Sequence, residues 1–343
     1  MSDETIEATE DLSSLNLEET ASEWGRVLES SPNDVQALVE LSLCYGRMHR
    51  SDEAIHMARR AVELASEYAP AHSALGIELF LRDENDEAES ELRRAIELDP
   101  ELSAAHFPLA QVLADQGDYD EGDEMLAKAR EVAGEDPAQV AHGWYVEAYI
   151  NLARGDLDEG ERCIHEALEL EGANPRIAAL AYANLGSIQT RRRKYDLAMG
   201  NLAKAIQLNH HLCGAQWRLG QLYLFKKRYS DALTALQAAS RDSRLAGPRL
   251  HYYLGLVYGK LGDTERSQEH YQEALNLGLT GRYALAARRA LIWSRAGVRW
   301  LAYALAGCLA AWLAVTRLPT PTVVFLALLI FLYAAYRWWT ERA

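Results

Sequence analysis

Histidine and cysteine are the side chains in this sequence that could hold a metal ion or act as nucleophiles. The four cysteines lie far apart and lack the C-x-x-C spacing of a zinc or redox site: Cys44, Cys163, Cys213 and Cys308. The ten histidines form no H-E-x-x-H pattern, and the sequence contains neither a P-loop nor a G-x-S-x-G turn. We therefore expect a protein that is not an enzyme and that uses no metal and no cofactor.

The net charge of the chain argues against nucleic acid as a partner. The formal charge is -15 at pH 7 and the pI is about 5.2, so the chain as a whole repels phosphate backbones. Two basic runs, Arg191–Lys194 and Lys226–Arg228, stand out against this acidic background. We interpret them as solvated turns, with contact to anionic lipid or to an acidic partner as the alternative.

The elements that position these residues recur with a period close to 34 residues. Six similar segments are spaced by 34, 34, 38, 38 and 34 residues: SDEAI from residue 51, NDEAE from 85, YDEGD from 119, LDEGE from 157, YDLAM from 195 and YSDAL from 229. The period and the segments resemble those of the tetratricopeptide repeat (TPR) family, whose unit is a helix–turn–helix of about 34 residues. The resemblance implies an all-α fold, a TPR-type α-solenoid in which the repeats form a right-handed superhelix.

Small residues fall where paired helices must cross closely. Position 27 of every repeat is alanine: Ala61, Ala95, Ala129, Ala167, Ala205, Ala239 and Ala274. Position 8 is also small throughout: Ser42, Gly76, Ala110, Ala148, Gly186, Gly220 and Gly255. A crossing distance of about 8–10 Å leaves no room for a large side chain at such positions. The register therefore gives about seven repeats, at residues 35–68, 69–102, 103–136, 141–174, 179–212, 213–246 and 248–281.

Segments around and between the repeats complete the expected TPR superhelix of residues 15–281. Residues 1–14 are acidic and show little apolar periodicity, so we expect a disordered tail there. The segment Leu17–Pro32 resembles a lone second helix that caps the first repeat. Extra residues on both sides of the fourth repeat, around 134–139 and 172–176, make its register less regular.

Two uncharged runs near the C-terminus fit a transmembrane hairpin. Residues 300–316 and 318–336 contain no charged side chain, and each run can reach across a hydrocarbon core of about 30 Å. We therefore expect two transmembrane helices, at 300–316 and 320–337, within a hairpin of residues 298–339. A basic capping and juxtamembrane helix at 282–297 would precede them. The alternative is a buried helical hairpin in a soluble C-terminal domain.

Arginines flank this hairpin and predict its orientation. They lie before the first run and after the second: Arg282, Arg288, Arg289, Arg295, Arg299, Arg337 and Arg342. The connecting loop has only Arg317. Because cytoplasmic segments carry the excess of basic residues, we expect an integral membrane protein whose TPR domain and both termini face the cytoplasm.

The TPR resemblance also implies where a ligand would bind, because the first helix of each repeat lines the concave side in that family. The residues at its usual ligand-facing positions that we assign to a partner-binding groove are Phe107, Tyr145, Tyr149, Asn184, Arg191, Trp217, Arg218, Phe225, Tyr252, Tyr253 and Lys260. Aromatic and arginine side chains are typical of the energetic centres of protein interfaces. We expect a protein or peptide ligand that is acidic, aromatic or ended by a carboxylate. The alternative is that the superhelix packs many of these rings into its own interior.

Only part of the family's clamp for a C-terminal carboxylate is present. Asn184 and Arg218 match the third and fifth residues of its Lys, Asn, Asn, Lys, Arg set. Tyr145, Tyr149 and Gly214 stand where the other three would be, so we do not expect a chaperone-tail clamp.

The combined features favour an interaction protein. We expect a membrane-anchored TPR adaptor that binds partners in its groove and recruits or assembles them at the cytoplasmic face of a membrane. Two alternatives remain open at this point. One is a scaffold that self-associates on the membrane surface, and the other is a regulatory subunit of a membrane-bound enzyme or protease.

Overall fold

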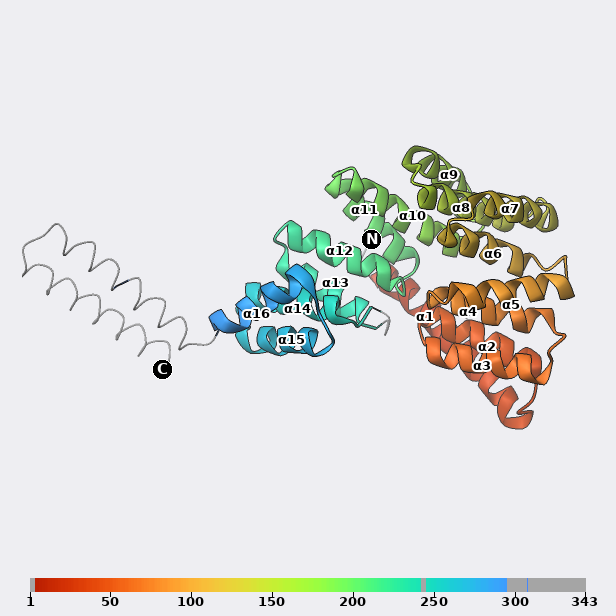
Figure 1. Ribbon diagram of the computed structural model, residues 1–343, viewed down its shortest axis with the longest axis horizontal. Coiled ribbons are helices and arrows are strands. Elements are labelled where there is room, and N and C mark those ends of the chain that lie inside the picture. The colour runs from red at the N-terminus through yellow and green to blue at the C-terminus, as the bar shows by residue number, and fades with distance from the viewer. Residues whose placement is uncertain (1–3, 242–244, 295–306, 308–343) are drawn as a thin grey trace, which may run out of the picture. The chain divides into compact units, whose positions relative to one another are not determined.

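The computed structural model describes residues 4–241, 245–294 and 307 of the chain (Figure 1). Within these residues it contains sixteen α-helices and no β-strand. The helices belong to two compact units, which divide between Ala246 and Gly247. The expected all-α, TPR-like solenoid is confirmed by this architecture.

Unit 1 contains one long helix followed by six helix pairs. The long helix is α1 (Glu4–Ser30). The first helices of the pairs are α2 (Val35–Arg47), α4 (Ala69–Leu81), α6 (Ser103–Gln116), α8 (Pro137–Arg154), α10 (Pro175–Arg191) and α12 (Cys213–Phe225). The second helices are α3 (Ser51–Leu64), α5 (Asn85–Leu98), α7 (Tyr119–Ala133), α9 (Leu157–Glu169), α11 (Tyr195–Leu208) and α13 (Tyr229–Ala239). Each pair packs on the next one along the chain, as the repeats of a solenoid do.

Unit 2 contains α14 (Pro248–Leu261), α15 (Thr264–Asn276) and α16 (Gly281–Ser294). Ala284 and Ala287 of α16 lie in one buried cluster with Tyr271 and Ala274 of α15, so α16 covers the end of the last repeat. The two units divide after α13. The expected superhelix over 15–281 includes residues of both units and stays a prediction. Helix α13 has 11 residues against 13 to 15 in the other second helices, and therefore offers less surface to a following repeat.

Glycine at position 8 lets the two helices of a repeat touch. A Cβ atom at Gly186 would lie 2.7 Å from Leu202 Cγ, and one at Gly76 would lie 2.6 Å from Leu92 Cγ. Both leucines are fully buried. Because protein interiors are close-packed, no larger residue fits at these two glycines without movement of the opposite helix. The small residues thus set the distance between the paired helices.

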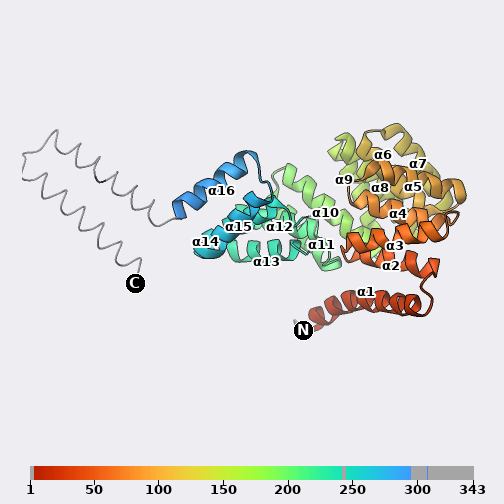
Figure 2. The ribbon, with the colours of Figure 1, turned by 60° about the horizontal axis from the view of Figure 1, so that its bottom comes forward.

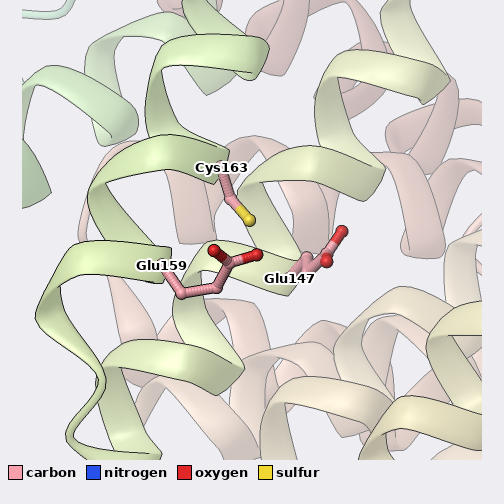
Figure 3. Close-up of side chains that lie close together, drawn as sticks. All are labelled: Glu147, Glu159 and Cys163. Carbon is pink, nitrogen blue, oxygen red and sulfur yellow. The ribbon is translucent and has the colours of Figure 1, made fainter.

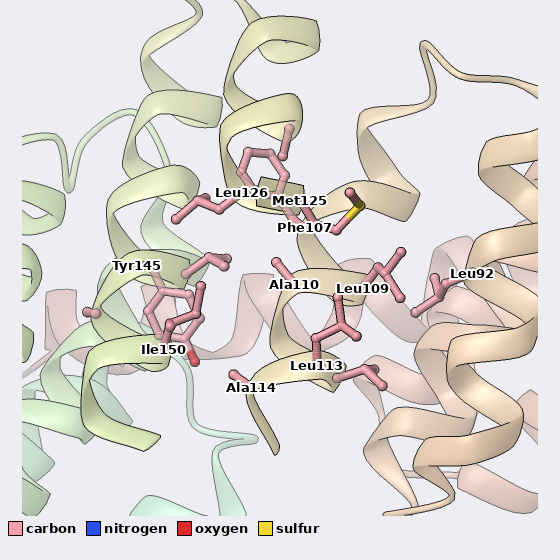
Figure 4. Close-up of a cluster of buried hydrophobic side chains, with 14 of the residues drawn as sticks. Leu92, Phe107, Leu109, Ala110, Leu113, Ala114, Met125, Leu126, Tyr145 and Ile150 are labelled. Carbon is pink, nitrogen blue, oxygen red and sulfur yellow. The ribbon is translucent and has the colours of Figure 1, made fainter. Parts of the chain in front are cut away.

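A continuous hydrophobic core runs from α3 to α10. Figure 4 shows part of it, in which Leu109 and Leu113 of α6 lie near Leu92 of α5. Burying each such side chain stabilises the fold by about 1.5–3 kcal/mol relative to leaving it exposed. The core therefore fixes the positions of the first helices, whose other sides remain available to solvent.

The turns inside the helix pairs use the left-handed region of backbone conformation. Three of them place a glycine there, with φ of 92° at Gly117, 97° at Gly155 and 90° at Gly262. The equivalent positions of the other four pairs hold larger residues at φ between 58° and 61°: His49, Asp83, Arg193 and Lys227. A side chain in this region costs about 1–2 kcal/mol, so these four turns carry local strain that the glycine turns avoid.

The extra residues on either side of the fourth repeat form short turns followed by the first residues of α8 and α10. Pro137 and Pro175 occupy first-turn positions of α8 and α10, where a missing N–H costs nothing. Asp136 and Asn174 cap these helices by accepting hydrogen bonds from backbone N–H groups two to three residues inside them. Consequently α10 has 17 residues against 13 in α12, and its added turn carries Arg176.

Helix α1 begins earlier than the sequence indicated. We expected a disordered tail over 1–14, whereas α1 starts at Glu4. Residues 4–24 contain neither glycine nor proline, and acidic residues in the first turns complement the positive end of the helix dipole. Figure 2 shows α1 beside α2, and Leu28 packs against a cluster that includes Leu38 and Ala71. The later half of α1 therefore covers the first repeat.

None of the helices in the described part of the chain is both long and apolar enough to cross a bilayer. Apart from Gly307, the two runs at 300–316 and 320–337 lie outside the described residues. The transmembrane hairpin over 298–339 therefore stays a prediction.

Candidate partner-binding surface

The first helices of unit 1 form a continuous inner face. In succession α2 contacts α4, α4 contacts α6, α6 contacts α8 and α8 contacts α10. The second helices from α3 to α11 instead pack between the first helix of their own repeat and that of the next. Neighbouring repeats approach most closely on the inside of a curved stack, so these contacts place the first helices on the inside. We call the exposed surface of α2, α4, α6, α8, α10 and α12 the inner face.

Tyr145 of α8 connects the core to the inner face. Its side chain is 7% exposed and its ring belongs to the buried cluster of Figure 4. Its hydroxyl lies near the side chain of Asn184 on α10. Burial raises the pKa of Tyr145, while the nearby charges of Arg176 and Arg218 act in the opposite direction. The hydroxyl is therefore a neutral polar group next to two cations.

Tyr149, one turn further along α8, is held by a carboxylate. Its hydroxyl donates a hydrogen bond of 2.6 Å to Asp115 Oδ1, and its ring meets Phe80 edge to face at 6.5 Å. Desolvation raises the pKa of Tyr149, and the hydrogen bond to Asp115 raises it further. Desolvation also raises the pKa of Asp115. The pair is thus a fixed polar element of the inner face.

Helix α12 carries the most accessible of the predicted groove residues. Arg218 is exposed and donates a hydrogen bond of 2.6 Å to Ser187 Oγ of α10. Trp217 is half-buried beside it. Phe225 is 63% exposed, although its ring lies 4.7 Å from that of Tyr195. The exposed ring of Phe225 lies on the same helix as the guanidinium of Arg218. Aromatic rings and arginine together are suitable contacts for a partner chain.

Arginines on several helices and turns of the described chain pair with carboxylates. Arg93 is one of them, since it binds Glu89 at 2.9 Å and Glu121 at 2.7 Å. Among residues 17–241 and 245–292, whose side chains the structure describes, no carboxylate forms an ion pair with these four arginines of the first helices: Arg47, Arg176, Arg191 and Arg218. Desolvation lowers the pKa of Arg176 and of Arg218, and a neighbouring arginine lowers each of them further. We call these four residues the inner arginines.

The two ends of the inner face meet within unit 1. His49 Nε2, in the turn after α2, donates a hydrogen bond to the carbonyl oxygen of His211, which precedes α12. The two residues are 162 positions apart in the sequence. This contact explains how Arg47 of the first repeat comes close enough to Arg176 of the fifth for their charges to interact.

The structure does not bring all of the predicted groove residues together. Phe107 is 1% exposed, with its ring 4.3 Å from that of His142, so it belongs to the core and not to a ligand-facing surface. Lys260, Tyr252 and Tyr253 belong to unit 2. The latter two tyrosines form a local ring cluster with Tyr283 of α16. Within unit 1, six of the other predicted residues have accessible side chains on the first helices: Tyr149, Asn184, Arg191, Trp217, Arg218 and Phe225. Tyr145 is buried.

Sequence reasoning missed Arg47 and Arg176. Arg176 lies on the added turn of α10, outside the 34-residue register, so no repeat position assigned it to the inner face. Arg47 ends α2. Its proximity to Arg176 depends on the hydrogen bond between His49 and His211, which are far apart in the sequence. No local sequence pattern indicates such a contact. The short insertion at 172–176 was the one available signal.

A second cluster, Glu147, Glu159 and Cys163, resembles a set of metal ligands (Figure 3). Their potential ligand atoms lie within 4.8 Å of one another. However, Glu147 pairs with Arg130 at 2.6 Å and Glu159 pairs with Arg162 at 2.5 Å. Burial raises the pKa of Cys163 to about 11, so its thiol stays protonated at neutral pH. We interpret this cluster as an ion-pair network between α8, α9 and the end of α7.

Comparison with protein families identifies repeats in two parts of the chain. Models described as tetratricopeptide repeat match residues 45–103, 79–143 and 248–278. No curated protein sequence matches the chain. The matched residues include the helices from α3 to α7 and the pair α14 and α15.

Solved structures with the same arrangement of helices show low sequence identity. A chain of the APC/C hetero-tetramer Cut9–Hcn1 is 18% identical over 80% of this chain and 52% of its own length, with a TM-score of 0.55. Yeast Tom70 is 17% identical over 81% of this chain and 59% of its own, with a TM-score of 0.53. Human IFIT1, solved as a dimer with m7Gppp-AAAA, is 15% identical over 92% of this chain and 76% of its own length, with a TM-score of 0.55. The chain thus spans about half the length of the Cut9–Hcn1 chain, and these likenesses show the fold alone.

Proposed function

Because the chain is a tetratricopeptide-repeat protein, we propose that unit 1 binds a protein segment along its inner face and that the C-terminal runs hold the protein at a membrane. In this role the chain is an adaptor that recruits a partner to the cytoplasmic side of the membrane or assembles it there. We propose binding and not catalysis. The stacked repeats are a general protein-interaction module, while the partner and the anchoring are specific to this proposal.

The observation that carries the binding role is the composition of the inner face. Trp217, Phe225 and Arg218 lie on one helix and are partly or largely accessible. Aromatic rings and arginine contribute most of the binding free energy in many protein interfaces. A fold likeness supports the same role, since the Cut9–Hcn1 structure is that of a hetero-tetramer.

Anchoring is supported by α16 and by the sequence after it. Leu285 and Ile292 are 52% and 51% exposed, and Arg282, Arg288 and Arg289 are exposed on the same helix. Basic and aliphatic side chains together suit the interface of a bilayer with anionic lipid. The uncharged runs at 300–316 and 318–336 follow a few residues later.

Affinity capture with the full chain tests the binding role. The tagged protein is expressed in its native cells, extracted in mild detergent and compared with the variant carrying Trp217→Ala and Phe225→Ala. Leu197→Ala is the matched control, because Leu197 is 59% exposed on a second helix, α11. We expect one set of partners with the wild type and the control, and its loss with the double variant. Equal capture by all three proteins would exclude the inner face as the binding surface.

Three further measurements test the anchoring and the self-association alternative. Resistance of the chain to extraction from membranes at alkaline pH is expected of a protein with two spans, whereas release into the supernatant would contradict it. Protease added to sealed vesicles of known sidedness should cleave unit 1 only from the cytoplasmic side. Size measurement of the detergent-extracted chain at micromolar concentration distinguishes an adaptor monomer from a self-assembling scaffold.

A further inference from the structure

Helix α16 carries small and large side chains on different faces. Ala284 and Ala287 are buried in the cluster that α16 forms with α15. Leu285 and Ile292 point away from this cluster, with side chains that are 52% and 51% exposed. These two residues are seven positions apart, close to two helical turns, so they lie on one line along the helix. The helix is therefore held by the last repeat on one side and presents an aliphatic line on another.

Arginines flank this aliphatic line. Arg288 and Arg289 follow Leu285 by three and four residues, and a rotation of about 100° per residue places them on either side of the line. Both are exposed, as is Arg282 one turn before Leu285. Arginine can cover apolar surface with its methylene groups while its guanidinium reaches a charged group. We call these five residues the outer face of α16: Arg282, Leu285, Arg288, Arg289 and Ile292.

The charge of the outer face is opposite in sign to that of the whole chain. The chain has 50 Asp and Glu residues, but none of them lies between Glu273 and Glu341. The same stretch contains seven arginines and no lysine, and five of these arginines precede Trp300. An anionic surface is therefore attracted to this part of an otherwise acidic chain.

A bilayer that contains anionic lipid matches the outer face in both composition and position. A helix with an aliphatic line between basic residues can lie in the plane of the interface, with its aliphatic groups at the acyl boundary and its cations among the phosphates. The first uncharged run begins at Trp300, eight residues after Ile292. Eight residues extend over at most about 29 Å, so insertion of that run keeps the end of α16 near the bilayer surface.

We propose, on the basis of the anchoring proposed above, that the outer face of α16 binds the surface of a bilayer that contains anionic lipid. The uncharged runs insert into the bilayer, and α16 adds a second contact that depends on the charge of the lipid. Because Ala284 and Ala287 of the same helix pack against α15, the last repeat lies about one helix diameter, roughly 10 Å, from the headgroups. Helix α16 thus sets the distance between this repeat and the membrane.

A fluorescent label on the outer face tests this contact in the full chain. In a Cys308→Ala background, Leu285→Cys is labelled with an NBD dye, while the three described cysteines are buried and stay unlabelled. The protein is reconstituted into nanodiscs that include a spin-labelled phosphatidylcholine as quencher. Discs of phosphatidylcholine alone are compared with discs in which about a third of the lipid is phosphatidylglycerol. Gln272→Cys carries the label in the control, because Gln272 is exposed on α15, one turn after the acidic Glu269.

In discs with phosphatidylglycerol we expect strong quenching of the label at position 285 and little at position 272. Quenching at position 285 should fall in discs of phosphatidylcholine alone. It should also fall in about 0.5 M KCl, which screens the attraction between arginine and lipid. Blue-shifted NBD emission in the same samples reports the loss of water around the label.

Two double variants test the role of the arginines. Arg288→Gln with Arg289→Gln should lower the ratio of lipid-bound to free helix about thirtyfold, because each basic residue near a charged bilayer contributes a factor of about five. Arg94→Gln with Arg162→Gln is the matched control, since it removes two exposed arginines of unit 1 that form ion pairs within α5 and α9. This control should leave the quenching unchanged. Thermal unfolding of each variant checks that it is folded.

Several results would overturn the proposal. Equal quenching in both kinds of disc would exclude selection by lipid charge, and unchanged quenching in the Arg288 and Arg289 variant would exclude the arginines. Shielding of the label at position 285 in detergent that grows with protein concentration would assign the outer face to a second copy of the chain. A chain that elutes with the discs while this label is not quenched keeps the anchoring and loses the α16 contact. A chain that elutes apart from both kinds of disc contradicts the anchoring as well.

Discussion

Gly186 of α10 lies directly against Leu202 of α11. A Cβ atom on Gly186 would be 2.7 Å from Leu202 Cγ and 3.2 Å from the backbone oxygen of Ala198. Neither neighbour can move without shifting a fully buried helix contact. We expect Gly186→Ala to lower the free energy of unfolding by about 1–3 kcal/mol, measured by chemical denaturation.

Gly200→Ala on the neighbouring helix α11 is the matched control for this substitution. A Cβ atom at Gly200 would meet nothing within 4 Å, and the residue is exposed inside α11. Alanine is a better helix former than glycine, so Gly200→Ala should raise the free energy of unfolding by about 0.5–1 kcal/mol. Effects of the same sign at both positions would mean that close packing does not decide the outcome at Gly186.

The strained turns offer a second stability test. Arg193 and Lys227 occupy the left-handed region at φ of 60° and 61°, where glycine is free of steric cost. Arg193→Gly and Lys227→Gly should each raise the free energy of unfolding by about 0.5–1 kcal/mol. The reverse change, Gly155→Ala, should lower it, because Gly155 has a φ of 97°. If both glycine substitutions lowered the free energy of unfolding, the turns at Arg193 and Lys227 would not be strained.

The stability of unit 1 should fall as the solution becomes acidic, in part through His142. Desolvation, followed by the charge of Arg176, lowers the pKa of His142 from 6.5 to about 4. Below pH 6.5 the unfolded chain therefore binds a proton that the folded chain does not, and this favours unfolding until the pH reaches about 4. We expect a loss of about 1–2 kcal/mol from this group between pH 7 and pH 5, after allowing for its partial exposure.

Denaturation curves at pH 7, 6 and 5 for the wild type and for His142→Gln measure that contribution. Other groups titrate equally in both proteins, so the difference between the two pH slopes reports His142. The variant should lose less stability on acidification than the wild type. Parallel slopes would show that His142 is protonated at similar pH in the folded and unfolded chains.

The described cysteines should resist alkylation while the chain is folded. Cys44, Cys163 and Cys213 are at most 4% exposed, and burial raises the pKa of both Cys44 and Cys163. Because only the thiolate reacts rapidly, iodoacetamide at pH 8 should modify these three positions at least a hundredfold faster after denaturation than before. Peptide mass spectrometry measures each position separately. Fast labelling of Cys163 in the native protein would contradict its burial.

Most of the fold could be predicted from the sequence because a solenoid repeats the same local helix packing in every unit. The period, the small residues at positions 8 and 27, and the glycine turns each reflect contacts within a repeat or with the next one. The start of α1 at Glu4 was missed, because its acidic composition resembles a solvated tail as much as a helix. The division after α13 has no signal in the sequence, because the last pair matches the repeat pattern as well as the others do.

The candidate site was predictable only where it follows the repeat register. Tyr145, Asn184 and Arg218 lie near one another because they occupy positions 5 and 6 of successive first helices. Phe107 has an equivalent position but points into the core, where it contacts His142. Arg176 could not be assigned, because a four-residue insertion has no counterpart in the register.

The hydrogen bond from His49 to the carbonyl oxygen of His211 changes how unit 1 should respond to heat or denaturant. In an open array of repeats, each unit depends only on its immediate neighbours, and an end can fray while the middle stays folded. Here the first pair is also tied to the joint before the sixth, so loosening either place removes support from the other. Melting of unit 1 should therefore be more cooperative than a linear stack of equal length would allow.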